Sequence, residues 1–397
     1  GWPKFRADEP PGGPADEYRA LLEEALAGVK EGELALRARL LSQLAEQISM
    51  EARESHSQRA VALARESGDP DALFGALYSR LAALLGPDDI RRRFQVATEL
   101  LDLAIRGRSK EKVFVARESR IRSLMALGDI AGMDREIDSC HDLAEELRVP
   151  IYRHSLARFR MARALGDGRL KEAERLNHEI LVLGGKADDS SAELLNAMLT
   201  GWLHYLRGDL LSTRELIEGL LERIAFIGPI SLALAAFVHA ELDEPEAARR
   251  HFDRLAAEDF TDVPRDEAWL MTVSIAAETC AYLDDQRRAE TLYELLVPYA
   301  DLLVSHQHMR IYLGSVHHVL GRLAETRGER EGAAIHYEAA IESSQRIGAR
   351  PHLVRTQDAY GRMILEAEPI SRHQRERARE LLARAEATAR ELGMKRL

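Results

Sequence analysis

The histidines around residue 310 come closest to metal chemistry in type and spacing: His306, His308, His317, His318 and, further on, His336. On a helix the eleven-residue gap between His306 and His317 is about 16 Å, so one ion cannot bind both. His318 and His336 could meet across a helical hairpin, but no carboxylate or cysteine at ligand spacing joins them. We therefore interpret these side chains as helix surface or groove, and expect no metal ion and no cofactor.

Gly184-Gly185-Lys186 is a candidate phosphate loop. Such a loop needs a glycine where Ile180 stands and a Ser or Thr where Ala187 stands, because backbone amides and a magnesium-binding hydroxyl hold the phosphates. We therefore interpret the two glycines as a helix C-terminus. The sequence contains no Gly-x-Ser-x-Gly, His-Glu-x-x-His or paired-cysteine motif. Its carboxylates are too numerous to single out an acid–base pair, and we expect no enzyme.

Composition narrows the class of protein. The 397 residues are 46% hydrophobic and 30% charged, with a formal net charge of −11, which argues against direct nucleic-acid binding because that usually needs a basic face. The longest apolar run, 226–238, is too short to span a bilayer and contains Gly228-Pro229, so we expect no membrane insertion. Cys140 and Cys280 are far apart, and we expect buried free thiols in a cytoplasmic protein.

The elements that would position any site follow a repeat: an apolar helix, a turn and a second helix. The turn residues are Gly128, Gly168, Gly208, Asp243, Asp285 and Gly328. In the clearest copy Ala333, Tyr337 and Ala340 follow the turn at offsets that place all three on one helical stripe. Seven residues before their turns, Gly201 and Gly321 are expected to be points of close helix approach.

No stretch alternates β-branched and polar residues, so the sequence predicts helices throughout and essentially no sheet, with one helix over 306–327. Breaks are predicted at Gly68-Asp69-Pro70 and Val149-Pro150. Residues 1–15 are rich in Pro and Gly and are expected to form an irregular lead-in. Because the chain begins with Gly rather than Met, we expect it to be part of a longer or processed protein.

This pattern resembles the tetratricopeptide repeat. Leu320-Gly321, Gly328, Ala333, Tyr337 and Ala340 match the small and aromatic positions of that family. The resemblance implies an all-α, right-handed superhelical solenoid of degenerate hairpins that runs continuously over 16–397. The ideal repeat has about 34 residues, so the longer units here imply extended helices.

The C-terminal third resembles the helical-repeat region of bacterial STAND-ATPase signalling proteins, such as MalT-like LuxR-family activators and cyclase–ATPase fusions. The resembling elements are Leu296-x-Pro298-Tyr299-Ala300, Leu320-Gly321-x-Leu323-Ala324 and His336-Tyr337-Glu338-x-Ala340. This resemblance implies the sensor or regulatory arm of a larger signalling or transcription-regulatory protein. ATPase, cyclase and DNA-binding activities are not assigned to these residues, because none of the corresponding motifs occurs in the chain.

In tetratricopeptide folds the first helix of each hairpin faces a concave groove. The family's register, carried onto this sequence, implies a wall formed by Arg122, Arg158, Met198, Trp202, Tyr205, Phe237, Ile275, Tyr282, His318 and Arg322. Trp202 and Tyr205 are three residues apart on one helix face, and aromatic residues with polar groups are favoured at recognition surfaces.

The functional hypothesis is a non-catalytic groove with an aromatic centre that holds a protein segment, a peptide or a small-molecule inducer. Arg158 or Arg322 would orient a carboxylate or phosphate of that ligand. One alternative is that a compressed superhelix packs the same residues as core. Another is a freestanding scaffold or homo-oligomerisation module.

Overall fold

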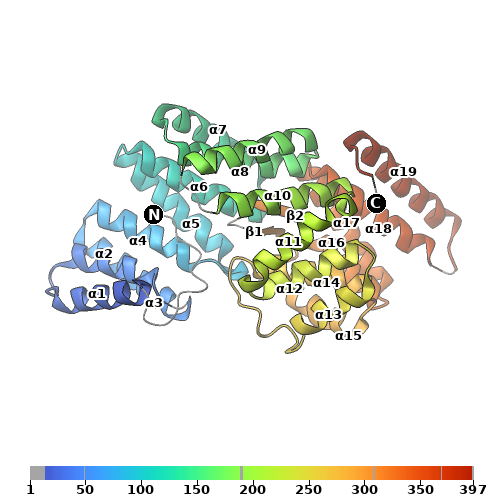
Figure 1. Cartoon of the computed structure of the whole chain (residues 1–397), viewed down its shortest axis with the longest axis horizontal. Coiled ribbons are helices and arrows are strands. Elements are labelled where there is room, and N and C mark those ends of the chain that lie inside the picture. The colour runs from blue at the N-terminus through green and yellow to red at the C-terminus, as the bar shows by residue number, and fades with distance from the viewer. Residues whose placement is uncertain (1–13, 49, 188–190, 307–308, 368, 396–397) are drawn as a thin grey trace. The chain divides into compact units, whose positions relative to one another are not determined.

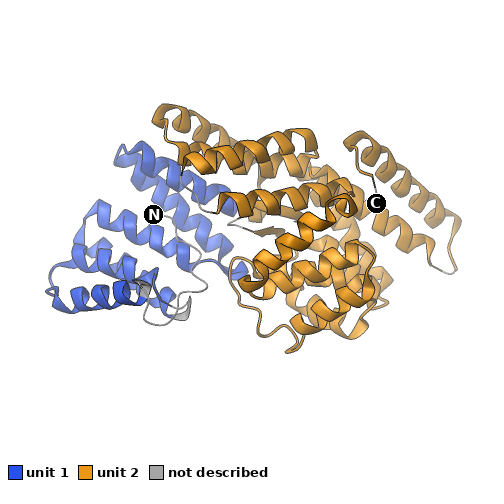
Figure 2. Ribbon diagram, in the orientation of Figure 1, with its two compact units in different colours: residues 1–124 blue, residues 125–397 orange. Residues whose placement is uncertain are grey.

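The computed structural model describes residues 14–48, 50–187, 191–306, 309–367 and 369–395. These residues are helical almost throughout, as the sequence predicts (Figure 1). The chain divides into two compact units, residues 1–124 and 125–397 (Figure 2). The boundary falls within one helix, α6. The continuity of the repeat across this boundary stays a prediction. The right-handed twist of the superhelix also stays a prediction.

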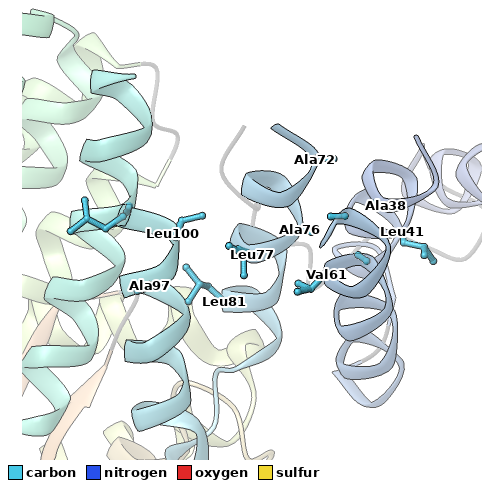
Figure 3. Close-up of a cluster of buried hydrophobic side chains, with 13 residues drawn as sticks. Ala38, Leu41, Val61, Ala72, Ala76, Leu77, Leu81, Ala97 and Leu100 are labelled. Carbon is cyan, nitrogen blue, oxygen red and sulfur yellow. The ribbon is translucent and has the colours of Figure 1, made fainter. Parts of the chain in front are cut away.

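The first unit is built from helices that pack against their neighbours in the sequence. They are α1 (Pro14–Gly28), α2 (Leu34–Ala45), α3 (Met50–Ser67), α4 (Pro70–Ala83), α5 (Ile90–Arg106) and the start of α6 (Lys110–Leu127). Alanines such as Ala38 and Ala76 are fully buried in a cluster that also contains Leu77 and Leu100 (Figure 3). Asp69 caps α4 by accepting hydrogen bonds from two backbone amides, which confirms the predicted break there.

The second unit continues the hairpin arrangement. Its helices are α7 (Ile130–Leu147), α8 (Pro150–Asp167), α9 (Leu170–Lys186), α10 (Ala192–Arg207), α11 (Arg214–Ile224), α12 (Pro229–Glu241), α13 (Pro245–Leu255), α14 (Trp269–Tyr282), α15 (Gln286–Leu296), α16 (Val316–Thr326), α17 (Arg330–Ile347), α18 (Arg350–Leu365) and α19 (Arg372–Leu392). Sequential pairs such as α8–α9, α16–α17 and α18–α19 pack together. Short 3-10 turns flank α11 on both sides, at Leu210–Thr213 and Ala225–Ile227.

The predicted turn and stripe positions of the clearest repeat are confirmed. Gly328 takes the left-handed conformation, with φ +79°, that ends a helix at low cost for glycine. Ala333, Tyr337 and Ala340 are fully buried. A Cβ at Gly321 would lie 2.8 Å from the Tyr337 ring, so this glycine is the expected point of close approach.

Gly201 is different, and the prediction for it is wrong. A Cβ built on Gly201 meets no atom within 4 Å. The helix neighbouring α10 therefore does not press against this position. Gly201 instead faces the open space described below.

The described part of the chain is all-α as predicted, apart from one short antiparallel hairpin that precedes α16 and replaces the start of the helix predicted over 306–327. Its strands are β1 (Leu303–His306) and β2 (Ile311–Ser315), with Ser305 opposite Tyr312. The helix predicted from residue 306 begins only at Val316. The strands are buried on both faces, so no alternation of apolar and polar residues marks them in the sequence. Gly314, with φ +89°, is incompatible with the predicted helix.

The hairpin lies inside the second unit, where β1 packs against α14 and β2 against α8 and α17. Arg310, only 1% exposed, donates hydrogen bonds to the carbonyl and hydroxyl oxygens of Ser155 at 2.8 and 2.6 Å. Its guanidinium stacks over Phe159. The Tyr312 ring occupies the space that a side chain at Gly166 would need. These contacts fix the hairpin against α8.

Candidate functional site

An aromatic cluster joins α10 and α12. Ring centroids are 5.5 Å apart between Trp202 and Tyr205, 5.1 Å between Tyr205 and Phe237, and 6.3 Å between Trp202 and Phe237. Trp202 and Phe237 are buried, whereas Tyr205 is partly exposed. Edge-to-face pairs of this kind stabilise by about 0.5–1.5 kcal/mol beyond the area they bury. The cluster is therefore a rigid wall.

This wall borders a space between α10, α11 and α12 that we call the apolar cavity. The space between the lining side chains amounts to about 480 Å³ when the part open to solvent is included. The lining is almost entirely apolar and includes Met198, Gly201, Trp202, Leu220, Leu234 and Phe237.

A second space, the polar cavity, lies on the other side of Tyr205 and Phe237, which line both cavities. It is enclosed by α14, α16, α18 and the β-hairpin. Its polar lining residues are Ser274, Glu278, Ser315, His318, His352, Arg355 and Thr356. The two cavities share Tyr205 and Phe237 as lining residues, and we treat them together as the candidate site, with an apolar and a polar half.

Glu278 is the centre of the charges around the polar cavity. Its carboxylate lies 3.3 Å from His318 Nε2 and 3.7 Å from Arg322 Nε. Burial raises the pKa of this carboxyl, but the positive charges of His318, Arg322 and Arg355 outweigh burial and lower the pKa to about 2. Glu278 is therefore ionised at neutral pH.

Arg355 is held in one orientation. Its guanidinium lies 3.9 Å from the centre of the Tyr205 ring and donates a hydrogen bond to the Tyr205 carbonyl at 3.1 Å. Glu241 lies 3.8 Å from the same group. A cation stacked on an aromatic face and bonded at its edge has little freedom to rotate.

Thr356, His318 and Glu278 form a row of hydroxyl, imidazole and carboxylate. Thr356 Oγ1 lies 3.0 Å from His318 Nδ1. The hydroxyl also donates to the His352 carbonyl at 2.9 Å, so it accepts a hydrogen bond from His318 instead of giving up its proton. A nucleophile would need the reverse arrangement. The row therefore positions His318 and gives Thr356 no activation.

Six of the predicted groove residues line these two cavities: Met198, Trp202, Tyr205, Phe237, Ile275 and His318. Arg322 lines neither cavity and is paired with Glu278 and with Glu325 at 3.9 Å.

The remaining predicted residues lie elsewhere. The Tyr282 hydroxyl donates a hydrogen bond to Asp243 at 2.9 Å. Arg158 is buried in α8 and lines neither cavity. Arg122 belongs to the first unit and pairs with Glu118. The arginine beside the aromatic centre is Arg355, which the sequence did not indicate.

Glu278 was also not predicted as a site residue, although one feature of the sequence indicates that it needs partners. It is the only charged residue of α14, whose sequence is WLMTVSIAAETCAY. A charge on an otherwise apolar, buried helix requires partners. Glu278 and Ile275 are three residues apart and both line the polar cavity. Ser274, Arg355 and Thr356 carry no comparable local signal.

The histidines meet in a different combination from the one weighed in the sequence. His317 Nδ1 lies 3.0 Å from His336 Nδ1, and the Tyr293 hydroxyl lies 2.9 Å from His336 Nε2. Burial and the neighbouring His317 lower the pKa of His336 to about 4. His308 lies outside the described residues. In the part of the chain that the structure describes, no three His, Cys, Asp or Glu side chains are grouped as metal ligands.

Comparison with known proteins shows no family. No protein-family model matches the chain, and no curated protein matches it. Among solved structures, a match is a "circular tandem repeat protein with novel repeat topology and enhanced subunit contact surfaces". It shares 15% identity and covers 95% of this chain and 89% of its own, with a TM-score of 0.19. A score this low supports no argument about fold or function, and the helical hairpins stand on the contacts described above.

Two further predictions concern the cysteines and insertion into a membrane. Cys140 and Cys280 are both buried and form no disulfide, as predicted. Within the described ranges, no helix combines the length and the apolar character needed to cross a bilayer.

Proposed function

We propose that residues 125–397 form a non-catalytic ligand-binding module, with the apolar and polar cavities as its binding site. The observation that carries the proposal is Gly201. Glycine in the middle of a helix costs about 1 kcal/mol relative to alanine, and no neighbouring atom requires it here. Its missing side chain instead leaves the apolar cavity open. Gly75 has the same freedom but lines neither cavity, so what distinguishes Gly201 is its place beside Trp202 in the lining of the apolar cavity.

The energetics suit a small ligand. Burying about 300 Å² of apolar surface at roughly 25 cal/mol per Å² contributes about 7.5 kcal/mol before the costs of association. The aromatic wall is already assembled, so binding orders few side chains. The nearby polar groups would fix the orientation of the ligand.

The regulatory role comes from the sequence resemblance to sensor arms of bacterial signalling proteins. In this proposal the ligand binds one arrangement of the helices more tightly than another, because only differential affinity can shift a conformational equilibrium. The helix α11 borders the apolar cavity and is flanked by 3-10 turns. It is the element through which we expect ligand occupancy to be transmitted.

The test fills the cavity from Gly201. A Gly201→Leu variant places an apolar side chain in the open space, with a Cβ that clashes with nothing. Gly75→Leu is the matched control, since Gly75 also lies within a helix, α4, with no atom near its Cβ and lines neither cavity. Toluene binding is measured by ligand-observed NMR, and unfolding by circular dichroism.

We expect wild type and Gly75→Leu to bind toluene, and Gly201→Leu to lose binding without a fall in melting temperature. Gly201→Ala is the milder variant and should weaken binding in the same direction. Unchanged toluene binding in a folded Gly201→Leu protein, or no binding by wild type, contradicts the proposal.

A further inference from the structure

The polar cavity contains three buried polar atoms that have no hydrogen-bond partner: Ser274 Oγ, His352 Nε2 and Arg355 Nε. Ser274 is 2% exposed and His352 7% exposed. An unsatisfied buried polar atom typically costs about 1–3 kcal/mol. Three of them around one cavity indicate a partner that is not part of the chain.

The three atoms differ in the hydrogen bonds that they offer. Arg355 Nε is a donor, and its direction is set by the stacking on Tyr205. The Ser274 hydroxyl can donate or accept. Burial lowers the pKa of His352 to about 3, so its ring is neutral. His352 donates to the backbone of Tyr312 while Nε2 has no partner, so Nε2 presents a lone pair.

The charges that surround the cavity are already paired. Glu278 faces His318 and Arg322, and Arg355 faces Glu241. A charged group of a ligand would therefore find no opposite charge in the cavity that is still unpaired. Burying a charge without such a partner is costly. An uncharged group that both donates and accepts hydrogen bonds avoids this cost and satisfies the three atoms.

We propose that the ligand is an amphipathic molecule in which an apolar, preferably aromatic, body carries an uncharged head group of the hydroxyl or primary-carboxamide type. The body occupies the apolar cavity against Trp202. The head group passes Tyr205 and Phe237, which line both cavities. There its oxygen accepts from Arg355 Nε and from the Ser274 hydroxyl, and its O–H or N–H donates to His352 Nε2. This inference rests on the proposed function and specifies its ligand class.

A matched series of probes separates body from head. Propylbenzene supplies the body alone, and 3-phenylpropanol and 3-phenylpropanamide add uncharged heads. Their charged counterparts are 3-phenylpropanoate and 3-phenylpropylammonium. Binding to the full chain is measured by competition NMR at neutral pH.

We expect the alcohol or the amide to bind at least about 10-fold more tightly than propylbenzene and than either ion. Equal affinity of propylbenzene and both uncharged compounds overturns the head-group inference and leaves the proposed function intact. Tighter binding of an ion also overturns it. If no compound binds, propylbenzene included, the proposed function and the inference both fail.

A Ser274→Ala variant tests the orphaned atoms directly. It should weaken amide binding about 5-fold or more and leave propylbenzene binding unchanged. Its melting temperature should not fall, because the Ser274 hydroxyl makes no hydrogen bond. The control is Ser79→Ala, which loses the hydrogen bond from a buried hydroxyl to the Ser42 carbonyl. It should melt lower and bind normally. Wild-type amide affinity in Ser274→Ala would mean that only water occupies the polar cavity, which overturns the inference.

Discussion

The ring of Tyr337 lies where a side chain at Gly321 would begin, 2.8 Å from the position of a Cβ. Tyr337 is fully buried, and its hydroxyl donates to Glu325 at 2.6 Å, so the ring cannot move aside cheaply. Helix α16 therefore approaches α17 through glycine, and this contact is part of the core of the last repeats.

Gly321→Ala and Gly201→Ala should change stability in opposite directions. Both substitutions improve helix propensity by about 1 kcal/mol. At Gly321 the overlap with Tyr337 should outweigh this gain and give a net loss of about 1–3 kcal/mol. At Gly201 the added methyl meets open space, and stability should rise. Urea unfolding of both variants checks the difference, and changes of the same sign would contradict it.

Glu278→Gln should alter how the free energy of unfolding depends on pH in the acidic range. The folded-state pKa of Glu278 is about 2, against an ordinary value of 4.5. A lowered carboxyl pKa contributes stability that is present above pH 4.5 and is lost as pH falls towards 2. The contribution corresponds to up to about 3 kcal/mol. Unfolding free energies of wild type and variant should therefore converge as pH falls through this window, and a constant difference would contradict the prediction.

His336→Gln should alter the pH dependence of stability over a different, less acidic range. The pKa of His336 is lowered from 6.5 to about 4 by burial and by His317. Protons then bind the unfolded state first, so wild type loses stability as pH falls from about 6.5 to 4. His352, which is common to both proteins, contributes in the same direction. The variant should lose less stability over this range in thermal melts, and an equal loss would show that His336 does not titrate in this way.

Arg310→Met should destabilise the second unit by about 2 kcal/mol or more. The substitution removes two hydrogen bonds to Ser155 and the stacking on Phe159, and the buried Ser155 hydroxyl loses this donor. Arg372→Met is the control, because the Arg372 side chain is 94% exposed and pairs with Glu376 only on the surface. It should change stability by no more than about 0.5 kcal/mol. Similar effects of the two substitutions would show that the hairpin does not need Arg310.

The helices and the repeat stripe could be predicted because they depend on local periodicity. Ala333, Tyr337 and Gly321 are defined by spacing within a single hairpin. The β-hairpin could not be predicted in the same way, since strands such as Ile311–Ser315 owe their conformation to burial among helices distant in sequence. Gly314, a residue of low helix propensity, is the local signal against a helix there.

The same distinction between local spacing and long-range packing applies to the residues of the candidate site. Trp202 and Tyr205 share a helix face by their spacing, and Phe237 follows from the next repeat. Arg355 and Ser274 meet these residues only through packing between helices far apart in the chain, so no pattern in the sequence could place them there. The prediction consequently found the apolar half of the site more completely than the polar half.

The buried hairpin also bears on how the second unit folds. In solenoids whose repeats contact only their neighbours, folding can begin anywhere and spread one repeat at a time. Here Arg310 bonds to Ser155 across 155 positions, and Arg355 bonds to Tyr205 across 150. Such long-range closures slow folding and tie early and late repeats into one cooperative transition. Deleting the last hairpins should therefore unravel helices α8 and α10 as well, and not merely shorten the array.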